Sequence, residues 1–171
     1  MPRLTEAADL DDLLLYRLSR VLSVAGSMVI RLCEGRFGIT RREWRVIALL
    51  ARDEGLLSSQ LAERAQLDRA RTSRAVSSLV AKKLVRRQVG EGDRRQARLA
   101  LTAAGRTLYE QLFPLVQQIN RELLSPLSAR QLATLEAALG RLQDKADGMV
   151  AQAELPKADR RRGGRQRLHL G

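Results

Sequence analysis

The chain is poor in aromatic residues, cysteine and histidine, and these shortages exclude several classes of function. Of its 171 residues, five are aromatic, one is a cysteine and one is a histidine. The histidine, His169, lies in a Gly/Arg-rich tail, so the folded body can hold no Ser/His/Asp triad, Cys/His dyad or histidine-based metal site. We therefore expect no cofactor and no metal. An enzyme that uses a basic face on an acidic substrate is the least favoured class.

The single cysteine limits redox chemistry, because Cys33 alone cannot form an intrachain disulfide or a multi-cysteine zinc site. Arg31 and Arg36 lie close to it in sequence and would lower the pKa of its thiol. A redox-sensing regulator is therefore an alternative, although a buried structural cysteine is favoured. The acidic N-terminal stretch is unlike a signal peptide, and no apolar run approaches the roughly 20 residues that span a bilayer. We expect a cytoplasmic protein with no membrane contact.

The net charge of +12 is concentrated in two blocks. Residues 63–98 hold eleven basic residues against four acidic ones, residues 156–171 hold six against one, and the other 119 residues are neutral overall. In the first block the hydrophobic pattern changes from helical to strand period, so its cations share one compact substructure. No aromatic residue lies between Lys82 and Arg98, which removes the stacking platforms of single-strand binders. This combination favours duplex DNA as partner.

The hydrophobic spacing predicts six helices and one hairpin. Thr40 with Glu43 and Ser128 with Gln131 form capping boxes, and Ser58 and Asp68 are expected to cap two short helices. Pro114 is expected to bend the helix that contains it. The predicted helices are 10–34, 40–53, 60–65, 69–83, 102–124 and 128–150, and the predicted strands are 84–89 and 97–101.

Two short helices joined by a tight turn, followed by a basic hairpin, are typical of a winged helix. The predicted fold is mainly α with a small β-hairpin wing, combining a winged helix-turn-helix domain with a helical dimerisation region from both chain ends. The apolar faces of the terminal helices lie too far from the central module to join its core, so we expect a homodimer. The predicted parts are an N-terminal dimerisation helix (1–36), the DNA-binding domain (37–102), C-terminal dimerisation helices (103–155) and a flexible basic tail (156–171).

The polar face of helix 69–83 is expected to meet the major groove while the hairpin reaches a minor groove. Arginines there can donate to guanine or phosphate, serines to phosphate or base, and Ala70 can touch a thymine methyl group. Asp93 is expected to orient Arg95 while Arg94 enters the minor groove, and the reverse assignment of the two arginines is an open alternative. A plain hairpin-turn role for Asp93 is another. The predicted DNA-binding residues are Ser58, Arg69, Ala70, Arg71, Ser73, Arg74, Ser77, Ser78, Arg94 and Arg95.

Three segments, 38–50, 60–64 and 93–106, resemble the MarR family of bacterial transcription regulators. The resemblance implies a triangular homodimer joined through its first, fifth and sixth helices. It further implies that the dimer binds palindromic DNA and releases it when a phenolic compound or aromatic acid binds. Lys83 stands where the family commonly has a glycine, so helix 69–83 is expected to run on or to end without a left-handed cap. Arg71 replaces a small hydroxyl residue, so no operator preference is transferred.

The resemblance also implies an effector pocket lined by the first, second and fifth helices. Arg17 and Arg20 would pair with a carboxylate there, with Trp44 as a flat apolar wall. The alternative is that these are surface arginines and a core tryptophan. We predict a ligand-responsive regulator, acting as a repressor on pseudo-palindromic duplex DNA. A sequence-independent, nucleoid-type DNA-binding protein is the alternative. The basic tail either adds phosphate contacts or serves only solubility.

Overall fold

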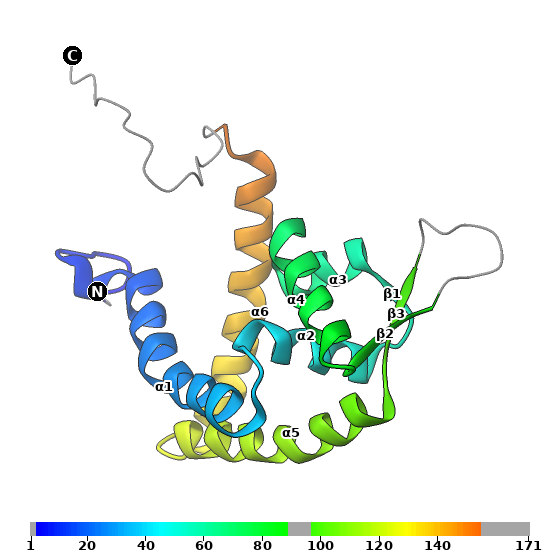
Figure 1. The fold of residues 1–171 in the computed structure, drawn as a ribbon. Helices are drawn as coiled ribbons and strands as arrows, with labels where there is room; N and C mark the ends of the chain where they lie inside the picture. Colours follow the sequence, from blue (N-terminus) through cyan, green and yellow to red (C-terminus); the bar gives the residue numbers. More distant parts are fainter. Residues whose placement is uncertain (1–2, 89–96, 155–171) are drawn as a thin grey trace, which may run out of the picture. The chain divides into compact units, whose positions relative to one another are not determined.

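A computed structural model describes residues 3–88 and 97–154, and the chain divides into two units, Met1–Ser125 and Pro126–Gly171. The fold is mainly helical with one small antiparallel sheet, as predicted (Figure 1). None of the helices in the described ranges has the length and apolar character needed to cross a membrane. The elements are η1 (Leu10–Asp12), α1 (Leu14–Phe37), α2 (Arg41–Arg52), β1 (Leu56–Leu57), α3 (Ser58–Ala65), α4 (Arg69–Ala81), β2 (Val85–Gln88), β3 (Arg98–Leu101), α5 (Ala103–Leu124) and α6 (Ala129–Gln152).

The first helix differs from the prediction at both ends. A short 3-10 turn precedes it, and extended backbone at Leu13 separates that turn from α1. At the other end α1 continues through Gly35 and stops only at Gly38, which adopts the left-handed conformation with φ of 63°. The helix ends at Gly38, where φ is positive, and not at Gly35, because a glycine at helical φ and ψ leaves the helical hydrogen bonds intact.

Three of the four predicted helix starts with capping residues are confirmed. The Glu43 carboxylate accepts from the Thr40 amide at 2.6 Å, and Asp68 accepts from the Arg71 amide at 2.7 Å. Ser128 and Gln131 form the capping box of α6. The prediction that Ser58 caps the third helix was wrong, because Ser58 is the first residue of α3 and Leu57 takes the cap position. The Gln60 side chain accepts from the Leu57 amide at 2.9 Å and replaces the missing serine cap.

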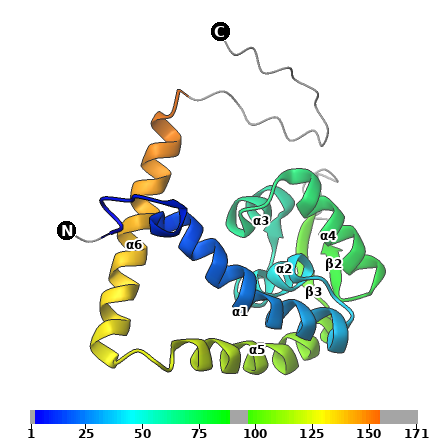
Figure 2. The same ribbon diagram turned by 90° about the vertical axis from the view of Figure 1, so that its left-hand side faces the viewer.

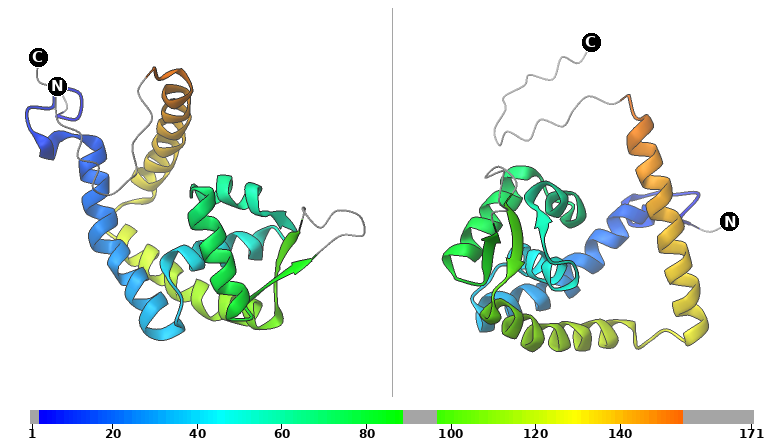
Figure 3. Two further views of the ribbon diagram at one scale, coloured as in Figure 1. Left: turned by 45° about the horizontal axis from the view of Figure 1, so that its top comes forward. Right: turned by 90° about the vertical axis from the view of Figure 1, so that its right-hand side faces the viewer.

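The sheet has three antiparallel strands in the order β1-β3-β2 (Figure 3). The predicted hairpin is present, with Val85 opposite Leu101 and Gln88 opposite Arg98. The prediction missed β1, in which Leu56 lies opposite Leu99. The tip of the hairpin, residues 89–96, lies outside the described residues.

The core lies where α2, α3 and α4 pack together against the sheet, with α5 covering α2. α1 packs against α5 and α2 (Figure 2). The buried face of α4 is the predicted one, and it consists of Thr72, Ala75, Val76 and Leu79. α4 is therefore fixed to the rest of the domain along one side, and its other side is exposed.

α4 ends at Ala81, so the prediction that it runs to Lys83 was wrong. Lys83 itself adopts the left-handed conformation, with φ of 57°. Its amide donates to the Val80 carbonyl, and the Leu84 amide donates to the Leu79 carbonyl, each at 2.9 Å. This pair of bonds is the Schellman motif. The expectation that the helix could end without a left-handed cap was also wrong, because Lys83 adopts the left-handed conformation at the position where the family commonly has a glycine.

Candidate nucleic-acid interface

The face of α4 opposite its buried side is exposed and basic. Arg69 and Arg74 lie on it with their side chains in solvent, and Ala70, Ser73 and Ser77 are exposed beside them. Ser58 is exposed at the first position of α3. The structure therefore brings most of the predicted DNA-binding residues to one accessible surface. Asp93, Arg94 and Arg95 lie outside the described residues.

Arg71 is held at the start of α4. Its Nε lies 3.2 Å from an Asp68 carboxylate oxygen, and the other carboxylate oxygen of Asp68 accepts the Arg71 amide. Asp68 thus caps the helix and orients an arginine with the same group. An arginine fixed by a carboxylate loses less conformational entropy when it binds a further acceptor.

An ion pair between the exposed Lys82 and the buried Glu43 anchors the far end of α4. Lys82 Nζ lies 3.0 Å from both carboxylate oxygens of Glu43 and 2.8 Å from the Gly38 carbonyl oxygen. The Glu43 side chain is 3% exposed. One ammonium group therefore joins the end of α1, the start of α2 and the end of α4.

The pKa of Glu43 reflects this environment. Burial raises it, but hydrogen bonds from the Ser78 hydroxyl, the Thr40 amide and the Lys82 ammonium outweigh burial and hold the pKa below its usual value. Glu43 is consequently a charged, satisfied group. Ser78, predicted as a DNA contact, is half-buried and directs its hydroxyl to Glu43.

Three further arginines, all exposed, escaped the sequence prediction of DNA-binding residues. Arg86 and Arg87 are exposed on β2, and their place in the basic block was the signal that could have identified them. Arg42, in the first turn of α2, lines a groove of about 210 Å³ beside α4. The other residues that line this groove are Thr40, Glu43, Arg71, Arg74, Ala75 and Ser78.

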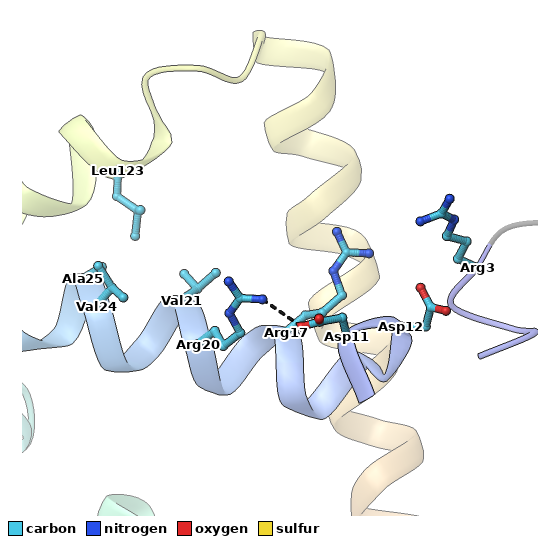
Figure 4. A pocket seen from close by; sticks show the side chains of 9 residues that line it. All are labelled: Arg3, Asp11, Asp12, Arg17, Arg20, Val21, Val24, Ala25 and Leu123. Carbon is cyan, nitrogen blue, oxygen red and sulfur yellow. Dashed lines mark hydrogen bonds and ion pairs between the residues drawn. The ribbon is translucent and has the colours of Figure 1, made fainter. Parts of the chain in front are cut away.

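Arg17 and Arg20 line a cavity of about 710 Å³ together with Val21, Val24 and other residues of the same unit (Figure 4). Arg20 pairs with Asp11 at 2.8 Å, and its guanidinium lies over the Tyr16 ring at 5.9 Å. No ion pair of Arg17 occurs within the described part of the chain.

Trp44 does not line this cavity. It is 8% exposed and stacks on Tyr109 with ring centroids 5.8 Å apart, while Phe113 lies 6.5 Å away. The structure therefore does not bring Trp44 together with Arg17 and Arg20. Packing of α2 on α5 turns the indole into the core, so the alternative of a core tryptophan holds.

Cys33 is fully buried, and burial together with the charge of Glu34 raises the pKa of its thiol to about 11. Arg31 and Arg36 do not offset this increase. A thiol with so high a pKa is almost entirely protonated at neutral pH and reacts slowly with peroxide. The structure therefore favours the structural role for Cys33.

Comparison with known proteins found one matching family model and several similar solved structures. Residues 37–96 match the model of the MarR family, whereas no curated protein matches the chain. The chain is similar to the crystal structure of a MarR family transcriptional regulator from Silicibacter pomeroyi DSS-3, with 28% identity and a TM-score of 0.69 over 81% of this chain and 98% of that one.

Two other solved structures are similar. A probable transcriptional regulator from Pseudomonas aeruginosa shares 27% identity with a TM-score of 0.66, over 78% of this chain and 99% of that one. The PcaV transcriptional regulator from Streptomyces coelicolor, solved in complex with its natural ligand, shares 25% identity with a TM-score of 0.67, over 82% of this chain and 98% of that one.

Proposed function

The chain belongs to the MarR family of transcription regulators, and from this premise we propose that it is a ligand-responsive repressor that binds pseudo-palindromic duplex DNA as a homodimer. The observation that carries the proposal is the exposed face of α4. Its arginines and serines stand in solvent while its opposite face is packed against α2 and α3. A helix fixed in this way presents its donors to a major groove at little entropic cost.

In this proposal the exposed face of α4 and the wing strands contact different parts of the DNA. Arg69, Arg71 and Arg74 supply donors to guanine and phosphate, and Ala70 supplies a methyl group for thymine. The exposed Arg86 and Arg87 on β2 add contacts to the neighbouring backbone. In this proposal Arg94 enters the minor groove and Asp93 orients Arg95.

Unpartnered apolar faces support the homodimer. On α1, Leu15, Val21 and Leu22 are exposed, and α6 leaves every residue unburied. A monomer would keep these faces in water, which is unfavourable by about 25 cal/mol per Å² of apolar surface. Pairing of two copies through residues 1–36 and 103–155 would cover them and place two α4 helices about one DNA turn, roughly 34 Å, apart.

The cavity beside Arg17 supports a small-molecule effector of the aromatic carboxylate or phenolic class. Its wall combines apolar side chains with the guanidinium of Arg17, a group able to pair bidentately with the carboxylate of a ligand. PcaV, with which this chain shares its fold, was solved with its natural ligand bound. Ligand binding would change the separation of the two α4 helices and so lower the affinity for DNA. The cytoplasm, where promoter DNA is reached, is the place of this activity.

Selection of bound duplexes from a random-sequence library tests the proposal. The expected product is a palindrome with half-sites about one helical turn apart, bound at least about a thousandfold more tightly than mixed-sequence DNA at the same salt concentration. Equal affinity for both duplexes would identify a nucleoid-type protein instead. Arg74→Ala should reduce the ratio of the affinities for the two duplexes by about tenfold, equivalent to a loss of about 1.4 kcal/mol of base discrimination.

A thermal-shift screen of aromatic acids tests the effector part of the proposal. A binding acid should raise the melting temperature of the wild-type chain and weaken its binding to the selected palindrome. Arg17→Gln should abolish both effects, whereas Arg31→Gln, on the same helix but outside the cavity, should preserve them. An acid that shifts both variants equally binds elsewhere.

A further inference from the structure

The groove between α2 and α4 carries more positive charge than the acidic groups beside it neutralise. Arg42 reaches it from the first turn of α2, and Arg71 and Arg74 reach it from two successive positions along one face of α4. Three arginines thus line a space of about 210 Å³. Like charges gathered on a surface repel one another unless an anion or solvent separates them.

Two of the three guanidinium groups have no ion-pair partner among the residues that the structure describes. Within residues 3–88 and 97–154, Arg42 and Arg74 take part in no ion pair, whereas Arg71 is paired with Asp68. Both unpaired side chains are exposed. They are therefore available to an external anion.

The only carboxylate that lines the groove, among the residues described, is Glu43, and it is already satisfied. Its oxygens accept from Lys82 Nζ at 3.0 Å, from the Thr40 amide at 2.6 Å and from the Ser78 hydroxyl. The ammonium of Lys82 balances its charge. The net charge at the mouth of the groove therefore remains positive.

We propose that this groove binds one backbone phosphate of the DNA whose major groove α4 enters, and that Arg42 is a phosphate-contacting residue. The inference rests on the proposed function and adds to it a contact from α2. Phosphates line both edges of a major groove, so a helix lying in it has phosphates along its sides. The guanidinium forks of Arg42 and Arg71 bind the same phosphate and fix the register of the domain on the duplex, while Arg74 reads a base.

The neighbouring arginine provides a matched control. Arg41 precedes Arg42 in the same turn of α2, but its guanidinium lies beside Gly26 of α1, within 3.3 Å of where a Cβ on that glycine would stand. Arg41 is absent from the groove lining. Arg41→Gln and Arg42→Gln therefore remove the same charge from adjacent positions and differ only in the direction in which the replaced side chain points.

The experiment measures the affinity of the full chain and both variants for the selected palindrome and for a mixed-sequence duplex, between about 50 and 200 mM salt. Arg42→Gln should lower both affinities by the same factor, about tenfold. Its plot of log affinity against log salt should be shallower by about 0.9, the slope that one neutralised phosphate contributes. Arg41→Gln should leave the slope unchanged. Equal slopes for the two variants would overturn the inference, as would a loss of affinity confined to the palindrome.

Two further measurements keep the result interpretable. If Arg42→Gln melts below the wild type, Arg42→Lys replaces it, and this variant should keep the slope but lose affinity because an ammonium group lacks the guanidinium fork. Failure of the proposed function is a separate outcome, since wild-type protein that shows no salt-dependent duplex binding would reject it. Wild-type binding combined with an unchanged slope for Arg42→Gln would reject only the groove.

Discussion

At the scale of single residues, Gly105, in the first turn of α5, lets two segments of the chain approach closely. A Cβ built on this glycine would lie 2.0 Å from the Leu84 carbonyl oxygen and 3.4 Å from a methyl group of Leu101. The Gly105 amide also donates to Thr102 Oγ1 at 3.0 Å, which fixes the start of the helix. Gly105→Ala should therefore lower the free energy of unfolding by about 2–3 kcal/mol, because α5 must move away from the strand connection.

Urea unfolding measures this change, and Gly140→Ala is its control. Gly140 lies within α6, and no atom stands within 4 Å of the position that its Cβ would occupy. Alanine there should stabilise the helix by up to about 1 kcal/mol, since glycine is the poorer helix former. Stabilisation by both substitutions would show that helix propensity, and not contact with Leu84, governs position 105.

Glu43 makes the stability of the domain depend on pH. Its pKa in the folded chain lies below the usual 4.5, because hydrogen bonds and the Lys82 charge outweigh burial. A carboxyl group whose pKa is lowered by folding contributes its full stabilisation at pH values above its usual pKa. This stabilisation is lost as the pH falls through the pKa of the folded state. At pH 7 Glu43→Gln should lower the free energy of unfolding by about 1–3 kcal/mol.

Comparison of wild type and Glu43→Gln by urea unfolding at a series of pH values tests this linkage. The difference between them should shrink as the pH falls below 4.5, where the wild-type carboxylate takes up a proton. A difference that stays constant from pH 7 down to about 3 would mean that the charge of Glu43 contributes nothing and that only its shape matters.

At the scale of elements, the end of α4 depends on a lysine in an unfavourable conformation. Left-handed backbone costs a non-glycine residue about 1–2 kcal/mol, and Lys83 adopts it with φ of 57°. Lys83→Gly should raise the free energy of unfolding by about 0.5–1 kcal/mol, part of the gain being lost to the freer unfolded chain. Ala81→Gly, in the last helical position, should instead destabilise by up to about 1 kcal/mol.

Thermal unfolding distinguishes these two variants. Opposite signs would assign the effect to backbone conformation at position 83. Destabilisation of both would indicate that the Lys83 side chain makes a contribution larger than its backbone strain, which would contradict the prediction. Because Lys83 lies between α4 and β2, its substitution also tests whether the connection between α4 and the wing strand tolerates a glycine.

Elements defined by local sequence could be predicted, and those defined by distant contacts could not. The capping boxes at Thr40 and Ser128 join residues three positions apart, so the sequence contains both partners. β1 has two residues and exists only because Leu56 pairs with Leu99. No periodic pattern can identify a strand so short.

In the candidate site, too, the residues set by local sequence could be predicted and those set by distant contacts could not. The polar face of α4 follows from helical spacing and was predicted, whereas Arg42 belongs to the site only through the packing of α2 on α4. Lys82 and Glu43 lie 39 positions apart, and no local rule connects them. Trp44 was assigned to a pocket because an aromatic side chain suits both a ligand wall and a core. Its stacking on Tyr109 decides for the core.

At the scale of the whole molecule, the unpartnered apolar surface remains to be explained. The central domain buries its own leucines and valines, but α6 has no buried residue in its 24 positions. Its apolar side chains recur at alternating spacings of three and four, which places them along one stripe. These residues are Leu132, Leu135, Leu139, Leu142, Ala146 and Met149. A helix of this kind is stable in water when a second apolar surface covers the stripe.

Leu139 lies in the middle of that stripe and is 45% exposed. Leu139→Glu should raise the dissociation constant of the proposed homodimer on the order of a hundredfold or more. The reason is that two copies of a leucine worth about 1.5–3 kcal/mol each are removed and two charges are placed at the interface. Sedimentation velocity over a range of protein concentrations measures the shift, and affinity for the selected palindrome should fall with it because one half-site binds far more weakly than two. Ala137→Glu adds the same charge about 200° around the helix and should leave the dimer intact. A Leu139→Glu variant that sediments like Ala137→Glu would exclude the stripe from the dimer interface.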